Sequence, residues 1–173
     1  MTGKTHATVG VLSTAALIIL HPKGFEVGNI QILPIISLAT AALGSYLPDI
    51  DIHQSALGRK YRIISKMLKH RGFTHTLVMP LCFLLLMYVV AHYMSPFSML
   101  VIGINSLLFG LMFGWILHIF ADMFNKKGVP LLFPITNSRI YVATVKTRHR
   151  SEYVWLALYI VCISILVVWL RFL

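Results

Sequence analysis

The chain has 173 residues, of which 58% are hydrophobic and only 12% are charged. Soluble domains are about 45–50% apolar and about 25% charged, so this composition excludes an ordinary soluble domain and points to a membrane protein. Fifteen Lys and Arg against five Asp and Glu give a net charge of +10, and two cysteines are too few for a disulfide scaffold. We predict a single integral-membrane domain over residues 1–173.

Five apolar runs predict membrane helices. They cover residues 7–20, 32–47, 76–94, 97–120 and 153–172. Because 20 helical residues rise about 30 Å, the thickness of the hydrocarbon core, the last three runs are long enough to cross a bilayer. The first two are short, and one of them can instead be re-entrant. The sequence therefore predicts an all-α, polytopic membrane helical bundle with about five transmembrane helices.

The basic residues divide unequally between the two sides of this bundle. With five crossings, one side holds the N-terminus and the segments 48–75 and 121–152, and thirteen of the fifteen Lys and Arg lie there. The positive-inside rule places that side in the cytoplasm. The topology accounts for the positive charge, so we expect no nucleic acid partner.

Two segments on the basic side differ in character. Residues 55–69 space apolar side chains at helical intervals between basic ones, which predicts an amphipathic helix in the membrane interface; an ordinary positively charged loop is the alternative. Residues 128–146 contain Gly128, Pro130 and Pro134, and residues 140–145 look extended. We expect a loop here that packs on the mouth of the bundle and forms a substrate wall.

Metal-binding residue types recur at the basic side of four predicted helices. From the first helix to the fourth, they are His6, then Asp49 and Asp51, then His70 and His75, and then His118 and Asp122. Ionisable residues at the edge of a membrane span are costly unless they are paired or bind a metal ion, and no matching set of Lys or Arg lies within the spans. A divalent cation is therefore the expected partner.

The composition of this group indicates what kind of metal site it forms. Imidazole and carboxylate ligands suit Zn²⁺, with Mn²⁺ and Fe²⁺ as alternatives. Seven candidate ligands exceed the number that one tetrahedral zinc uses, so one or two ions are expected. The group contains no cysteine, which favours an open catalytic site over a closed structural one. The alternative is a buried cluster of His–Asp hydrogen bonds that holds the bundle together.

Other polar residues receive secondary predictions. Arg71 is the cation best placed to hold a phosphate oxygen, and Arg139 is a weaker candidate for the same role. His53 follows Asp51 by two residues and is either an outer-shell group, a substrate contact or neither. The cysteines, Cys82 and Cys162, lie inside apolar runs and are expected to be small core residues without a disulfide.

The motifs occur in an order that resembles a known family. They are His6, Leu-Pro-Asp-Ile-Asp at 47–51, His-Arg-Gly-Phe-Thr-His at 70–75, His118-x₃-Asp122 and Gly-Val-Pro-Leu-Leu-Phe-Pro at 128–134. This pattern resembles the YdjM-like family of bacterial inner-membrane metal-dependent hydrolases, also labelled LexA-regulated or LexA-binding. The family is considered distantly similar to zinc-dependent phospholipase C and P1-type nucleases, which are all-helical phosphoesterases with His/Asp metal clusters.

The resemblance implies both site and function. Carried over residue by residue, it implies metal-ligand roles for His6, Asp49, Asp51, His70, His75, His118 and Asp122. We expect a multi-pass protein of the bacterial inner membrane, with its N-terminus and metal site facing the cytoplasm. The expected activity is metal-dependent hydrolysis of a phosphoester in a membrane lipid or lipid-linked substrate. Asp51 or Asp49 would accept a proton and Arg71 would hold phosphoryl oxygens. The alternative function is a metal-ion transporter or metal-gated membrane protein, since membrane His and Asp also build ion paths.

Overall fold

The computed structural model describes residues 1–28, 30–68, 72–94 and 98–173. The protein is mostly helical, with one small hairpin and two short 3₁₀ turns in the described residues. In chain order the elements are α1 (Gly3–Leu20), β1 (Phe25–Val27), β2 (Ile30–Ile32), α2 (Pro34–Gly44), η1 (Leu47–Asp51), α3 (Ala56–Lys60), α4 (Arg62–Met67), η2 (Phe73–His75), α5 (Val78–Tyr93), α6 (Met99–Met123) and α7 (Arg150–Phe172).

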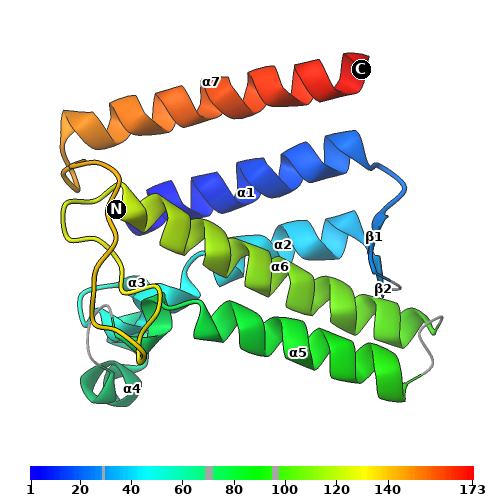
Figure 1. Ribbon diagram of the computed structural model, residues 1–173, viewed down its shortest axis with the longest axis horizontal. Coiled ribbons are helices and arrows are strands. Elements are labelled where there is room, and N and C mark those ends of the chain that lie inside the picture. The colour runs from blue at the N-terminus through cyan, green and yellow to red at the C-terminus, as the bar shows by residue number, and fades with distance from the viewer. Residues whose placement is uncertain (29, 69–71, 95–97) are drawn as a thin grey trace.

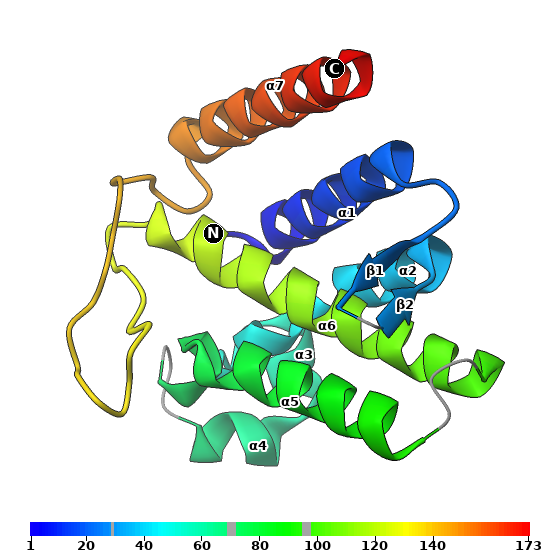
Figure 2. The ribbon, with the colours of Figure 1, turned by 45° about the vertical axis from the view of Figure 1, so that its right-hand side comes forward.

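The long helices run alternately in opposite directions, as the predicted bundle requires. Figure 1 shows α6 in the middle of the molecule, with α1 and α2 on one side and α5 on the other. The turned view agrees, and it shows α7 as the outermost helix beside α1 (Figure 2). The start of α1, the end of α6 and the η1–α4 region share one end, which we call the polar end. The hairpin β1–β2 lies at the opposite end (Figure 1).

Of the described helices, three are long and apolar enough to cross a membrane, namely α1, α6 and α7. The 16-residue α5 is apolar but shorter. The predicted second crossing, residues 32–47, is the largest departure from expectation: only the 11 residues of α2 are α-helical, a rise of about 16 Å. Ile32 belongs to β2, Pro34 opens the helix, and the chain after Gly44 turns into η1. The helical class is therefore confirmed, whereas the count of five crossings is not.

The hairpin was not predicted from the sequence. Its strands pair in antiparallel register from Phe25 opposite Ile32 to Val27 opposite Ile30. The buried side chain of Ile32 packs with Met87 of α5 and with Leu108 and Phe109 of α6, and Phe25 meets Phe109 edge to face. Each strand has only three residues, too few for an alternating pattern to stand out.

The short helix α2 packs very closely against α6 through small residues. A Cβ atom on Gly114 would overlap the carbonyl oxygen of Ala41, and one on Gly110 would overlap the hydroxyl of Thr40. Gly110 and Gly114 form a small-xxx-small pattern, which lets membrane helices approach until their backbones touch. The hydroxyl of Ser45 adds a 3.3 Å hydrogen bond to the Gly114 carbonyl. This contact carries the chain that follows α2 directly to the last turns of α6.

The outer helix α7 is fixed at its first turn by one buried acid. Glu152 is 1% exposed and accepts hydrogen bonds from the backbone N–H groups of Thr2 and Arg148 and from the Thr5 hydroxyl, each at 2.6 Å. Further along, the hydroxyl groups of Tyr159 and Ser13 are hydrogen-bonded. The first turn of α1 is thereby held against the start of α7.

Three local predictions need correction. Residues 55–69 do not form one amphipathic helix, because the non-helical backbone of Tyr61 (φ −112°, ψ 58°) separates α3 from α4. The segment 140–145 is not a continuous strand and makes only isolated bridges, Ile140 with Val129 and Val145 with Asn125, within the described residues. Cys82 and Cys162 are free, but they are exposed on α5 and α7 instead of buried in the core.

Candidate metal centre

Six of the seven predicted ligands come together at the polar end. They lie on four elements, as His6 in the first turn of α1, Asp49 and Asp51 in η1, His75 in η2, and His118 and Asp122 in the last turns of α6. The most exposed of them, Asp49, has only 7% of its surface accessible. The remaining predicted ligand, His70, and the predicted phosphate contact, Arg71, lie outside the described residues. The structure therefore brings the described members of the predicted group together, and their roles as ligands stay a prediction.

Among the described residues, two groups of three side chains have the spacing of metal ligands. One is His6, Asp49 and His118; the other is His75, His118 and Asp122. Within each group the ligand atoms lie within 4.8 Å of one another. His118 Nε2 is 3.6 Å from Asp49 Oδ1 and 3.3 Å from His75 Nε2, which in turn is 3.7 Å from Asp122 Oδ2. His118 belongs to both triads.

The backbone after α2 determines which nitrogen of His118 faces the cluster. His118 Nδ1 lies 2.7 Å from the carbonyl oxygen of Ser45. A carbonyl oxygen only accepts, so Nδ1 must carry the proton, and Nε2 of the neutral ring presents a lone pair. A backbone carbonyl that fixes a histidine in this way is the usual outer support of a metal-binding imidazole.

A carboxylate does the same for His75. Asp51 Oδ2 lies 3.2 Å from His75 Nδ1 and accepts a 2.7 Å hydrogen bond from the Thr74 hydroxyl. The indole N–H of Trp115 donates to the Thr74 carbonyl at 2.8 Å, which ties η2 to α6. Within the described chain Asp51 belongs to neither triad. Its position is that of the carboxylate that orients a histidine ligand.

These two supports leave two acceptor nitrogens facing each other. Nε2 of His75 and Nε2 of His118 are 3.3 Å apart, and with both protons on Nδ1 each presents a lone pair to the other. Such an arrangement is repulsive unless a proton or a cation lies between them. Two nitrogen ligands on one tetrahedral zinc, each at about 2.0–2.1 Å, are separated by about 3.3–3.4 Å. The donor set therefore fits a divalent metal ion.

His6 supports the same conclusion. Its ring stacks on that of His118, with centroids 3.7 Å apart and planes inclined by 17°. Both of its nitrogens are buried and have no hydrogen-bond partner among the residues that the structure describes. Nε2 lies 3.4 Å from Asp122 Oδ1, which also accepts from the amino group of Met1 at 2.5 Å. A buried imidazole without a partner is costly, and a bound cation would remove that cost.

The shared histidine limits how the cluster can be filled. Because Ser45 occupies Nδ1 of His118, only Nε2 remains, and one lone pair binds one ion. The two triads therefore could not each hold an ion of their own. Their residues would be ligands of one and the same ion. A second ion would need a set of ligands without His118.

Two contributors to this site were missed in the sequence. Ser45 and Thr74 act through a backbone carbonyl and a hydroxyl, and neither residue type signals a metal site. Thr74 lies inside the 70–75 motif next to His75, so its place there was the available signal. Ser45 carries no such mark, because its carbonyl is positioned only by the packing of α2 against α6.

The secondary candidates lie elsewhere. His53 is exposed, and its Nδ1 is 2.7 Å from the hydroxyl of Ser65 on α4, so it is not part of the cluster. Arg139 is exposed in the segment before α7. Glu26 lies in β1 at the opposite end of the molecule (Figure 1).

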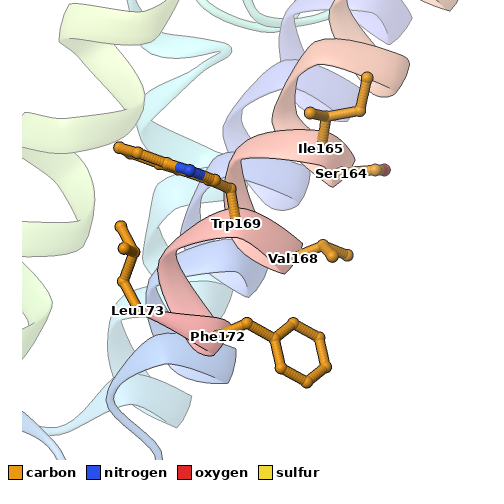
Figure 3. A pocket seen from close by; sticks show the side chains of 6 residues that line it. All are labelled: Ser164, Ile165, Val168, Trp169, Phe172 and Leu173. Atoms are coloured by element: carbon orange, nitrogen blue, oxygen red, sulfur yellow. The ribbon is translucent and has the colours of Figure 1, made fainter.

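A cavity of about 630 Å³ runs along the C-terminal part of α7, away from the cluster (Figure 3). Its lining residues are Ser164, Ile165, Val168, Trp169, Phe172 and Leu173. None of them is titratable, and the surface is the kind that an outer membrane helix presents to lipid. It offers no chemistry for catalysis.

Comparison with known proteins gives one family and a few relatives. The family model described as "YdjM inner membrane protein" matches residues 1–173. The "Uncharacterized protein YvsG" of Bacillus subtilis (strain 168) is 34% identical over 161 residues, covering 91% of this chain and 88% of that protein. The "Inner membrane protein YdjM" of Escherichia coli (strain K12) is 34% identical over 119 residues, 61% of this chain and 57% of its own length. That of Shigella flexneri matches equally well. No solved structure matches the chain.

Proposed function

The chain belongs to the YdjM family of inner membrane proteins, and from that premise we propose that it is a membrane-embedded metal-dependent hydrolase. The substrate we propose is a phosphoester in a lipid or lipid-linked molecule at the cytoplasmic leaflet. The observation that carries the proposal is the pair of facing Nε2 atoms of His75 and His118, 3.3 Å apart and each fixed from behind. A purely structural hydrogen-bonded cluster would place a donor against an acceptor there.

In this proposal the chain holds one divalent cation, Zn²⁺ being the best match for its nitrogen and carboxylate ligands. Candidate ligands are His6, Asp49, His75, His118 and Asp122. Such an ion would act as a Lewis acid, polarising a phosphoryl oxygen and acidifying water. Ser45 and Asp51 keep the histidines in the ligating tautomer. Asp49, the most accessible carboxylate of the cluster, is the group that we assign to accept the proton.

The location of the cluster supports a lipid substrate. It lies at helix ends, in the first turn of α1 and the last turns of α6, at the end that also carries the two basic segments. A site at this depth meets headgroups, whereas the ion sites of transporters usually lie near the bilayer midplane. The resemblance of the motifs to phosphoesterases with His/Asp clusters adds the reaction class, and it does so by analogy alone.

Metal analysis combined with a phosphoester panel tests the proposal. Detergent-purified wild type should contain about one zinc, manganese or iron ion per chain and should cleave at least one lipid phosphoester. In His118→Ala the metal affinity should fall by more than about 100-fold and cleavage should disappear. The matched control is His92→Ala, which removes an exposed histidine on α5 and should change neither property.

Three results would overturn the proposal. Wild type with stoichiometric metal that cleaves no lipid, nucleotide or other phosphoester would exclude the hydrolase. Metal uptake into proteoliposomes that His118→Ala abolishes would establish the transporter alternative. Wild type that binds no metal would return the cluster to a structural role.

A further inference from the structure

A second cavity at the polar end is positively charged. It has a volume of about 600 Å³ and lies where α3, α4 and the segment before α7 meet. Four of its lining residues are cations, namely Arg59, Arg62, Lys66 and Arg148. Arg59, Arg62 and Lys66 lie close together in the sequence, on α3 and α4, whereas Arg148 comes from the distant segment before α7 and is brought to them by tertiary folding.

No acidic side chain lines the cavity beside these four cations. The structure describes all five acids of the chain, and none of them lines the cavity. Three belong to the metal centre, Glu26 lies in the distant hairpin, and Glu152 is buried against α1. Four like charges around a shared space repel one another, and an anion bound between them would reverse that repulsion. Three of the four are arginines, whose planar donors match phosphate oxygens two at a time.

The helix α4 presents two different faces beside this cavity. Arg62, Ser65 and Lys66 lie one turn apart on one face and line the cavity. Ile63 and Met67 occupy the other face and are 77% and 81% exposed. A short helix with a basic face over a protein cavity and an apolar face without a protein partner is suited to the headgroup region of a bilayer.

The wall that comes from the segment before α7 is held in an unusual conformation. Arg148 has φ 59°, which residues with side chains adopt at a cost. Its backbone N–H donates to Glu152 Oε2 at 2.6 Å, and Glu152 is itself fixed by α1. On the opposite wall, His53 Nδ1 lies 2.7 Å from the hydroxyl of Ser65, which is 1% exposed. Each wall is therefore tied to the rest of the fold by a hydrogen bond.

We propose that this cavity binds the phosphate end of a lipid that carries a phosphomonoester or diphosphate group. Four cations without a counterion favour a group with two or more negative charges over the single charge of a phosphodiester headgroup. The cavity and the metal centre share the stretch from η1 to α4, where the Ser55 hydroxyl donates to the Asp49 carbonyl at 2.6 Å. That this lipid is the substrate of the metal centre rests on the proposed function. That the cavity binds the lipid does not depend on it.

Native mass spectrometry of the detergent-purified full chain tests the site. The probes are phosphatidic acid (a phosphomonoester), phosphatidylglycerol (a monoanionic diester), phosphatidylcholine (zwitterionic) and free inorganic phosphate. Wild type should bind phosphatidic acid at least tenfold more tightly than the other three. The double variant Arg62→Gln/Lys66→Gln should lose that preference and keep its metal content. The charge-matched control Lys126→Gln/Lys127→Gln, which changes two exposed lysines outside the cavity, should behave as wild type.

The outcomes distinguish this proposal from general attraction to charge, from binding of free phosphate and from the proposed hydrolase activity. Equal losses in both double variants would mean general attraction to charge and would overturn the site. If inorganic phosphate bound as tightly as phosphatidic acid, the cavity would be a site for free phosphate and not for a lipid. Binding of phosphatidic acid without cleavage of any ester would exclude the hydrolase activity and support the binding site. Cleavage of an ester without preferential binding of phosphatidic acid would exclude the binding site and support the hydrolase activity.

Discussion

The helices α6 and α7 are similar in length and apolar composition but differ in their place in the fold. They have 25 and 23 residues, and both are long and apolar enough to span a membrane. Yet 56% of the apolar window of α6 is buried inside the protein, against 0% for α7. The helix α6 contacts α1, α2, α5 and the hairpin, whereas α7 lies outermost beside α1 (Figure 2).

The difference between them lies in how each helix is attached. Gly110 and Gly114 let α2 touch the backbone of α6, and this contact brings the Ser45 carbonyl to His118. The helix α7 is held by a few polar groups, chiefly Glu152. Apolar composition therefore does not distinguish a helix that builds a site from one that faces lipid. In this protein the small residues at i, i+4 mark the closely packed helix α6, and one buried acid attaches the outer helix α7.

The largest loss of stability is expected from a substitution that disrupts the close contact of α2 with α6 at Gly114. Gly114→Ala places a methyl group against the Ala41 carbonyl and should cost about 2–3 kcal/mol of stability in detergent. The metal content should fall as well, because η1 and the Ser45 carbonyl move with α2. The measurements are the thermal unfolding midpoint and metal per chain.

Gly103→Ala is the matched control on the same helix. A Cβ atom at Gly103 meets nothing within 4 Å, so the variant should be neutral or slightly stabilised by the better helix propensity of alanine. If both variants lost equal stability, close packing would not be what distinguishes α6 from α7.

A smaller effect is expected at the attachment of α7. Glu152→Gln keeps the shape but replaces one acceptor oxygen by a donor, so one of the three hydrogen bonds is lost. We expect a loss of about 1.5–2 kcal/mol, seen as a lower unfolding midpoint and faster proteolysis of the segment before α7. Metal affinity should fall only severalfold, through the loosened first turn of α1 next to His6.

Glu26→Gln is the control for this carboxylate, since Glu26 is exposed in the hairpin at the other end. It should leave stability and metal affinity unchanged. A drop in metal affinity for Glu152→Gln as large as that for His118→Ala would show that α7 belongs to the site as fully as α6 does.

The smallest effect is expected halfway along α7. Tyr159→Phe removes the hydroxyl that is hydrogen-bonded to Ser13, and polar contacts between membrane helices are worth about 0.6 kcal/mol on average. The unfolding midpoint should shift slightly and metal content not at all. Tyr153→Phe, at a 66% exposed position, gives the baseline. A shift above about 2 kcal/mol would contradict the view that α7 is held mainly at its first turn.

The candidate metal centre was predictable in outline because its residues end or begin helices on one side. The spacing of His118 and Asp122 already places them on one face of α6, and the basic segments mark the end at which they lie. The roles within the centre were less predictable. Asp51 was grouped with Asp49 as a candidate ligand and proton acceptor, whereas its position beside His75 favours an orienting role. Two acids separated by one residue look equivalent in sequence, and only the η1 turn points them to different partners.

The hairpin and α2 show the limit of apolar runs as a guide. Residues 32–47 have the composition of a membrane helix, and their length alone gave no sign that three kinds of backbone share them. Pro34 and Pro48 mark the breaks, but each is also compatible with the first turn of a helix. The close contact with Gly110 and Gly114 selects a short α2.

The sequence by itself determined the membrane class, the helical architecture, the family and the end of the bundle at which the His and Asp residues meet. Composition, run length and charge distribution suffice for the class, the architecture and the end of the bundle, because each depends on transfer between water and lipid, residue by residue. The family followed from the order of the motifs. Only the tertiary structure decided which nitrogen of His118 faces the cluster, which acid supports His75, and that Arg148 joins the cations of α3 and α4 around one cavity. Those depend on backbone contacts between helices far apart in the chain, such as the Ser45 carbonyl at His118, and no local pattern encodes them.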